Sequence, residues 1–244
     1  MQKLKIILAI AAMLFIASNI DAQVKKAPVK KLPVTVKKTT SFKPPVLKKI
    51  PGIRIKLTTD SGILVIRLYD STPLHRDNFV KLVNEHFFDS LLFHRVIEGF
   101  MIQGGDPLSK NAEPGIMLGN GGGNMERIPA EFKPSLFHKK GVLAAARDNN
   151  PERASSACQF YLVQGKKYTQ DELNMMEAQM GRKFSVAQRL AYSTVGGTPF
   201  LDMNYTVFGE VEKGMEVIDK IAHVAKDGNN RPLENVRMKI ELIK

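Results

Sequence analysis

The chain has 244 residues and a mass of 27.2 kDa, which is enough for one large domain or two small ones with a hydrophobic core. Apolar residues make up 43% of it and charged residues 25%, which excludes a disordered chain and a bundle of membrane helices. The single cysteine, Cys158, excludes an internal disulfide framework and a cysteine-rich zinc site. The fold must therefore be stabilised by packing alone.

The positive charge is concentrated in one segment. The formal net charge is +12, of which +1 lies in residues 1–22, +9 in residues 23–52 and +2 in residues 53–244. The part expected to be globular is therefore nearly neutral, and the overall charge does not by itself indicate a nucleic-acid partner.

The first 22 residues have the layout of a secretory signal. Lys3 and Lys5 precede an unbroken apolar run over residues 6–17, and a short polar stretch ends in the small residue Ala22. Twelve apolar residues are too few to span a bilayer, which requires about 20. We therefore expect export to the periplasm with cleavage after Ala22. The alternative is an uncleaved N-terminal segment that tethers the protein to a membrane.

Residues 23–52 form a different kind of segment, in which Lys-Lys pairs alternate with prolines and no acidic residue occurs. Such a segment stays extended and solvated, and it is typical of a flexible linker. One interpretation is electrostatic contact with an anionic envelope surface, and the other is a spacer whose charge limits aggregation. Nucleic acid is disfavoured because no aromatic or arginine stacking platform is interleaved with the lysines.

From residue 53 onward the pattern predicts mostly short strands. Residues 53–58 and 63–69 alternate around turn residues at 60–62, which indicates a hairpin. Thr72 and Pro73 then supply an N-cap and a first-turn proline for a helix over 73–86. Further strands are expected over 91–97, 100–104, 141–147, 158–164, 206–211 and 236–243, with a second helix over 215–222.

Many short strands with two helices favour a mainly β fold, a closed barrel capped at its ends, because closure removes exposed strand edges. Residues 165–198 interrupt this rhythm with two capping boxes, which begin at Thr169 and Ser185 and flank Gly181. They predict a helical hairpin inserted into the barrel. Its methionine-rich stripe is expected to pack against the hairpin, and a flexible docking face is the alternative.

Three other patterns carry no chemistry that we assign. The glycine-rich residues 119–124 are not followed by the Lys-Ser/Thr pair of a phosphate-binding loop, which favours a surface loop. The five histidines lack paired metal-ligand spacing, so neither a metal site nor a cofactor is expected. Cys158 lies in a strand-like run with nothing to activate its thiol, which argues against thiol catalysis.

The most informative stretch is 93–106, which runs from Phe-His-Arg to Gly-Gly-Asp. By composition alone it is an apolar hairpin, and an edge strand with a surface arginine would look the same. Here the sequence resembles the cyclophilin family of peptidyl-prolyl cis/trans isomerases. The resemblance continues in the family's order through residues 78–82, 137–143, 154–161 and 201–211.

The resemblance implies a closed eight-stranded antiparallel barrel over residues 53–244, with a helix over each end. It also implies that Arg95 is the catalytic arginine and that Gln103 holds the substrate backbone. The remaining site residues that it implies are Phe100, Met101, Tyr161 and Leu201 in the proline pocket, Ala146 and Arg147 along the peptide groove, and Gln159, Phe200 and Tyr205 completing the site.

The function implied is acceleration of rotation about X-Pro bonds in unfolded or exported polypeptides, by an enzyme that acts as a monomer. The alternative is a non-catalytic proline-peptide-binding module or chaperone of the cell envelope. Two residues depart from the common pattern of the family. Phe200 replaces the tryptophan of many relatives, and Tyr161 replaces a phenylalanine, so its hydroxyl must find a partner or solvent.

Overall fold

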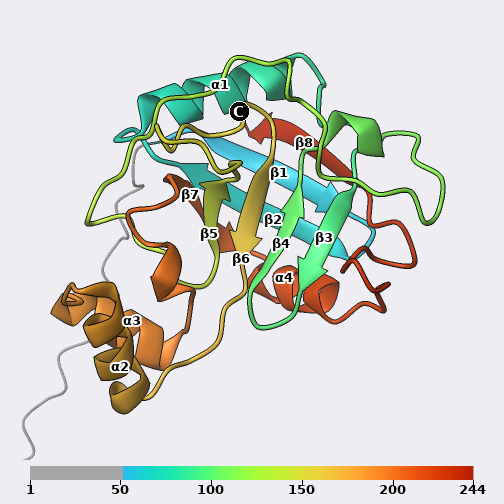
Figure 1. Ribbon diagram of the computed structural model, residues 1–244. Coiled ribbons are helices and arrows are strands. Elements are labelled where there is room, and N and C mark those ends of the chain that lie inside the picture. Colours follow the sequence, from blue (N-terminus) through green and yellow to red (C-terminus); the bar gives the residue numbers. More distant parts are fainter. Residues whose placement is uncertain (1–51, 244) are drawn as a thin grey trace, which may run out of the picture. The chain divides into compact units, whose positions relative to one another are not determined.

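The computed structural model describes residues 52–243, which belong to one compact unit, Lys49–Lys244 (Figure 1). The expected signal segment and nearly all of the expected linker lie outside the described residues. Within the described range, no helix has both the length and the apolar character needed to cross a membrane.

Eight antiparallel strands form one sheet in the order β3-β4-β6-β5-β7-β2-β1-β8. Every strand predicted from the sequence is present, and the mainly β class is confirmed. The strands are β1 (Arg54–Thr59), β2 (Gly62–Leu68), β3 (Phe93–Ile97), β4 (Met101–Gly104), β5 (Val142–Ala145), β6 (Phe160–Val163), β7 (Val207–Lys213) and β8 (Met238–Ile243).

The expected closed barrel is wrong: the sheet forms a half-barrel whose outer strands are β3 and β8. These edges meet only at one isolated bridge between Leu92 and Arg237, just before each strand begins. Beyond the bridge the loop that precedes β8 takes the place of a partner strand, since Val96 N donates to Asn230 O at 2.8 Å. The edge of β3 is therefore satisfied by a loop, which no periodicity in the sequence indicates.

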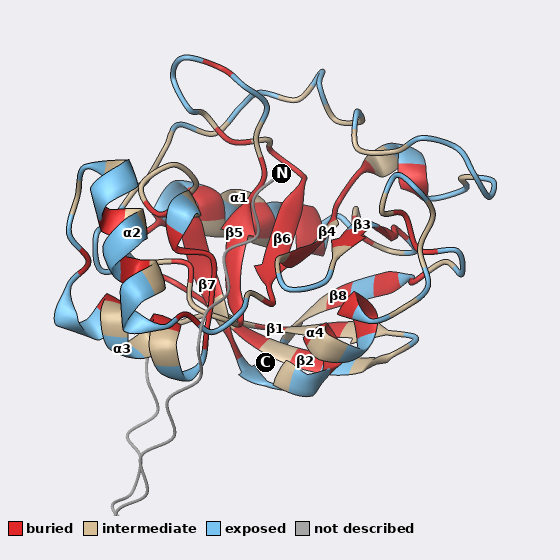
Figure 2. Ribbon diagram, turned by 60° about the horizontal axis from the view of Figure 1, so that its bottom comes forward, coloured by how far each residue is buried: buried red, intermediate tan, exposed pale blue. Residues whose placement is uncertain are grey.

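Two helices cover opposite ends of the sheet, as predicted: α1 (Pro73–Asn84) and α4 (Met215–Ala222) (Figure 1). Each directs a stripe of buried apolar side chains inward, as Phe79 and Leu82 do on α1 and Ile218 and Ile221 do on α4. The stripes join the inner faces of the strands in one core, where the buried residues of Figure 2 gather. This core fixes the strands that carry the candidate site.

The start of α1 differs from the prediction. Thr72 occupies the N-cap position, but its side chain makes no capping hydrogen bond. The carboxylate of Glu131 caps the helix instead, accepting from Leu74 N at 3.2 Å and from His75 N at 3.0 Å. A cap supplied by a residue so distant in the sequence leaves no local signal.

The inserted hairpin consists of α2 (Gln170–Met180) and α3 (Val186–Thr194), which follow β6. Both predicted capping boxes are present, and Gly181 ends α2 in the left-handed region with φ 64°. The hairpin has its own small apolar cluster, against which Met176 and Met180 pack, so the packing interpretation of the methionine stripe is confirmed.

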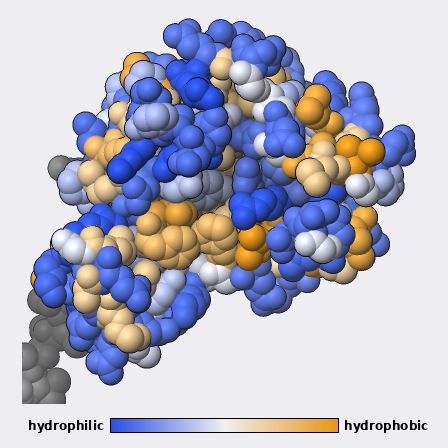
Figure 3. All heavy atoms as spheres, viewed as in Figure 1, coloured by the Kyte–Doolittle hydropathy of each residue, from blue (hydrophilic) through white to orange (hydrophobic). Residues whose placement is uncertain are grey.

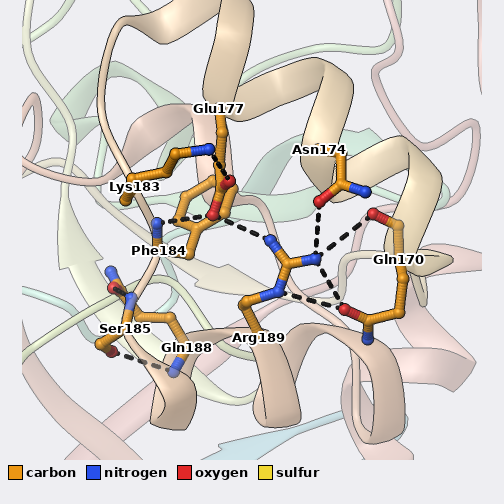
Figure 4. Close-up of polar contacts among 8 residues, drawn as sticks. All are labelled: Gln170, Asn174, Glu177, Lys183, Phe184, Ser185, Gln188 and Arg189. Atoms are coloured by element: carbon orange, nitrogen blue, oxygen red, sulfur yellow. Dashed lines mark hydrogen bonds and ion pairs between the residues drawn. The ribbon is translucent and has the colours of Figure 1, made fainter.

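A polar cluster ties the two inserted helices together (Figure 4). The carboxylate of Glu177 on α2 accepts from Lys183 Nζ at 2.9 Å, from Phe184 N at 2.9 Å and from Arg189 Nη1 at 2.8 Å. The hydrogen bond from Lys183, with those from Phe184 and Arg189, lowers the pKa of Glu177 to about 2. The hairpin is thus a folded element with internal polar and apolar contacts.

Candidate active site

The hairpin β3–β4 holds the arginine and the glutamine that the sequence singled out. Arg95 and Gln103 are cross-strand partners, and Arg95 Nη1 donates to Gln103 Oε1 at 3.2 Å. Gln103 Nε2 in turn donates to Gln159 Oε1 at 3.0 Å. The amide of Gln159 donates to the carbonyls of Gly119 and Gly121, at 2.9 and 3.0 Å. This chain of hydrogen bonds orients the exposed guanidinium of Arg95 through Gln103 and Gln159.

A cavity of about 330 Å³ lies beside Arg95. Nine of the eleven predicted site residues line it, and the most deeply buried are Met101, 2% exposed, and Tyr161, 4% exposed. Figure 3 shows apolar surface beside the inserted hairpin, bordered by hydrophilic side chains. The nine residues are Arg95, Phe100, Met101, Gln103, Ala146, Arg147, Tyr161, Leu201 and Tyr205.

The two remaining predicted residues lie at the margins of this cavity. Gln159 lines a second cavity of about 450 Å³ that shares Gln103, Ala146 and Arg147 with the first. Phe200 is 44% exposed, and its ring lies 5.6 Å from that of Phe100. The predicted residues therefore surround two adjoining cavities rather than one.

The glycine-rich residues 119–123, interpreted from the sequence as a surface loop, line the second cavity. The glycines are needed there for close approach: a Cβ at Gly121 would lie 1.9 Å from Asp106 Oδ1, and one at Gly122 would lie 2.3 Å from Cys158 Sγ. The glycine run itself was the available signal, since such runs mark places where a backbone comes close to other atoms.

His94, to which no role was assigned from the sequence, precedes Arg95 in β3 and lines the first cavity. Its side chain is 3% exposed, and both ring nitrogens are buried. Burial, opposed in part by Asp106, lowers its pKa to about 4. The imidazole is therefore neutral at pH 7, and the positive charge of this hairpin beside the cavity is that of Arg95.

Arg147 lines both cavities, and its guanidinium is held by three contacts. Its guanidinium lies 4.7 Å from the centre of the Tyr205 ring. Its Nε donates to Asn204 O at 3.0 Å and its Nη1 to Asp148 O at 2.9 Å. A cationic, aromatic-stacked group thus lines both cavities.

The hydroxyl of Tyr161 has a protein partner rather than solvent. Its oxygen lies 3.0 Å from His138 Nε2, and burial raises the pKa of the phenol well above 10. His138 Nδ1 lies 3.0 Å from Asp202 Oδ1. Neither His138 nor Asp202 was predicted as a site residue, because nothing local in the sequence indicates that they meet beneath this pocket.

Two negative expectations can be examined over residues 52–243. No group of three or more His, Cys, Asp or Glu side chains in that range could hold a metal ion. Cys158 is buried, and burial raises the pKa of its thiol, so the group stays protonated at neutral pH.

Comparison with known proteins identifies the family. The family described as cyclophilin type peptidyl-prolyl cis-trans isomerase/CLD matches residues 54–241. A Staphylococcus haemolyticus protein named as belonging to the peptidyl-prolyl cis-trans isomerases is 32% identical over 185 residues, which cover 75% of this chain and 87% of that protein.

Two further relatives match a similar share of this chain. A Streptococcus pyogenes protein named as a bifunctional phosphatase/peptidyl-prolyl cis-trans isomerase is 34% identical over 197 residues, 78% of this chain but 38% of that relative. The crystal structure of a Cryptosporidium parvum cyclophilin type isomerase, determined in the presence of the dipeptide Ala-Pro, has a TM-score of 0.56. It is 21% identical and covers 78% of this chain and 99% of its own. The chain belongs to the cyclophilin-type peptidyl-prolyl cis-trans isomerases and is an enzyme of that type.

Proposed function

We propose that this enzyme accelerates X-Pro isomerisation in exported polypeptides and that Arg95 stabilises the twisted imide. The observation that carries the proposal is the position of Arg95, oriented by Gln103 at the edge of an apolar cavity of about 330 Å³. A proline ring fits the chemistry of such a cavity, and the Arg95 guanidinium is a charged donor that lines it.

The reaction breaks no bond, so a single well-placed donor contributes a large share of the catalysis. Resonance gives the imide a rotation barrier of about 18–20 kcal/mol, and an X-Pro bond crosses it in tens to hundreds of seconds. When the bond twists, the prolyl nitrogen regains its lone pair and accepts a hydrogen bond that the planar states accept poorly. Arg95 would therefore bind the transition state better than either ground state.

A hydrogen bond from Arg95 alone barely accounts for the required lowering of the rotation barrier, so the pocket must also contribute. A hundredfold acceleration requires about 2.7 kcal/mol off the barrier. One hydrogen bond from a charged donor contributes about 1.5–3 kcal/mol, which barely reaches that value. Phe100, Met101 and Leu201 would add to it by excluding water and holding the ring, while Gln103 would fix the substrate backbone.

A non-catalytic peptide-binding module or chaperone remains the competing function for the same groove. The chain of hydrogen bonds from Arg95 through Gln103 to Gln159 favours catalysis, because simple apolar binding does not require an oriented cation at the cavity edge. The presence of Ala-Pro with the Cryptosporidium relative supports a proline-containing peptide as the ligand class.

A protease-coupled assay on a short X-Pro peptide tests the proposal. We expect Arg95→Ala to lower kcat/KM by about 10- to 100-fold with an unchanged circular dichroism spectrum. Arg76→Ala is the matched control, because this arginine lies on α1 and pairs with two surface aspartates away from both cavities. Equal rates for the wild type and Arg95→Ala would reject the role of the arginine.

Export and tethering are proposed from the N-terminal sequence alone. If residues 1–22 are a cleaved signal, N-terminal sequencing of the protein from a periplasmic fraction should begin at Gln23. Recovery of the intact N-terminus in membranes would instead support the uncleaved tether. If residues 23–52 contact an anionic surface, their deletion should release the protein from membrane fractions at low salt.

A further inference from the structure

The inserted hairpin and the floor of the candidate proline pocket meet in one buried polar network. On the pocket side stands Tyr161, with its hydroxyl on His138. On the insertion side stand Gln188 and Tyr192 of α3. Between them lies Asp202, 2% exposed and next in sequence to the pocket residue Leu201.

Asp202 accepts hydrogen bonds from both sides. Its Oδ1 accepts from His138 N at 2.8 Å and lies 3.0 Å from His138 Nδ1. Its Oδ2 accepts from Tyr192 OH at 2.7 Å and from Gln188 Nε2 at 3.0 Å. These four contacts match the acceptor capacity of a carboxylate, so every lone pair of this buried group is used.

The carboxylate sets the direction of the whole chain of hydrogen bonds. Because a carboxylate only accepts, His138 must donate to it from Nδ1, and in the neutral ring Nε2 is then the acceptor for the hydroxyl of Tyr161. The phenol oxygen is thereby held against His138, and the ring of Tyr161 is left to line the cavity.

The backbone around the network is packed too tightly to adjust. A Cβ at Gly197 would lie 2.2 Å from His138 O and 2.7 Å from Tyr192 Cε1. The neighbouring Thr198 N donates to His138 O at 2.8 Å. The segment that returns from the insertion to Leu201 therefore passes directly between α3 and the residue that holds Tyr161.

Two departures from the common family pattern, the tyrosine at the pocket floor and the helical insertion, thus meet in one structural unit. We propose that α3 positions the proline pocket, with Tyr192 and Gln188 acting as positioning residues through Asp202 and His138 on Tyr161. This inference rests on the proposed isomerase site, but neither α3 residue touches the substrate in it.

The test is a double-mutant cycle read as kcat/KM in the isomerase assay. Tyr192→Phe removes one donor to Asp202 and leaves the ring in place, and we expect it to lower kcat/KM about three- to tenfold. In a Tyr161→Phe background, where the network no longer reaches the pocket floor, the same substitution should change kcat/KM by less than about twofold. Equal effects in the two backgrounds, or none in the presence of Tyr161, would overturn the inference.

Tyr168→Phe is the matched control, because Tyr168 belongs to the same apolar cluster of the insertion and supplies none of the four contacts to Asp202. It should leave kcat/KM within about twofold of the wild type. If Tyr192→Phe fails to fold, Gln188→Met removes the other donor of α3 and should show the same dependence on Tyr161.

The Arg95→Ala variant separates the two proposals. If Arg95→Ala matches the wild type, the proposed role of the arginine fails. If Arg95→Ala is impaired while Tyr192→Phe matches the wild type, only the inference about the insertion fails.

Discussion

Two buried histidines in this molecule have the same kinds of neighbours and different consequences. His75 lies between Glu131 Oε2, at 2.7 Å, and Ser155 Oγ, at 2.9 Å. His138 lies between Asp202 Oδ1 and the hydroxyl of Tyr161, each at 3.0 Å. Each imidazole thus connects a carboxylate to a hydroxyl, and the first set has the composition of a hydrolytic triad.

The difference lies in what the hydroxyl faces. Ser155 is 1% exposed, and the cavity that His75 lines has a volume of about 10 Å³, which holds at most a single water molecule. Tyr161 instead lines a cavity of about 330 Å³. The composition of a hydrogen-bonded triad therefore does not indicate its function, and access to a substrate-sized space separates the structural set from the functional one.

The largest effect on stability is expected at the structural set. Glu131→Ala leaves the first turn of α1 and His75 without their acceptor, which should lower the free energy of unfolding by about 3 kcal/mol. Urea unfolding measures this. The kcat/KM of the folded fraction should stay within about twofold of the wild type.

Glu126→Ala is the control, because it removes an exposed carboxylate from the same loop. If the folded fraction of Glu131→Ala lost much more than about twofold in kcat/KM, the proposed distinction between the two histidines would be wrong.

Changes to the set of Asp202, His138 and Tyr161 should lower both the free energy of unfolding and kcat/KM. Asp202→Asn keeps the shape of the side chain but places an amide N–H₂ among four donors, which should lower stability by about 2 kcal/mol. We also expect kcat/KM to fall about tenfold, because His138 and Tyr161 lose their fixed orientation. A variant that loses stability and keeps full kcat/KM would place His138 in the same class as His75.

A third buried histidine sharpens the comparison because no carboxylate or hydroxyl of the described residues bonds its ring nitrogens. The pKa of His94 is about 4, against an ordinary value of 6.5 in the unfolded chain. The unfolded state therefore binds the proton first as pH falls, so the stability that the neutral ring provides is complete above pH 6.5 and declines below it. Burial lowers the pKa of His75 as well, which adds to the loss in the same direction.

For His94 the loss between pH 7 and pH 5 should be about 2 kcal/mol. His94→Gln removes the titrating group, so its free energy of unfolding should fall less over this interval than that of the wild type. Urea denaturation at the two pH values provides the measurement. Parallel losses in the two proteins would show that His94 does not titrate as its burial implies.

The smallest effect is expected at the solvent-facing side of the site. Arg147 is held over Tyr205 between the two cavities and should attract an acidic residue next to the substrate proline. Because such a pair is partly solvated, Arg147→Ala should reduce the ratio of kcat/KM for Glu-Pro over Lys-Pro peptides by about two- to fivefold. An unchanged ratio would remove Arg147 from substrate selection.

Local signals in the sequence predicted local structure correctly. The capping boxes at Thr169 and Ser185 are both formed, and Arg95 and Gln103 lie opposite each other on the predicted hairpin. These features depend on residues a few positions apart.

Features that depend on distant residues were missed. The cap on α1 joins Leu74 to Glu131, which are 57 residues apart in the sequence. The contact of His138 with Asp202 joins residues that are 64 positions apart. The prediction of a closed barrel was wrong for the same reason: a loop residue, Asn230, bonds to β3 where a strand was expected. Spacing along the chain carries no information about such pairings, whereas the family resemblance located most residues of the cavity.

Exchange and binding followed in one NMR sample test the central claim most directly. Magnetisation exchange between the cis and trans forms of an X-Pro peptide reports turnover, and chemical-shift changes of the same peptide report binding. Wild-type protein should speed the exchange, while Arg95→Ala should bind the peptide and leave the exchange at least about tenfold slower. Exchange as fast with Arg95→Ala as with the wild type, at equal binding, would contradict the role of this arginine in catalysis.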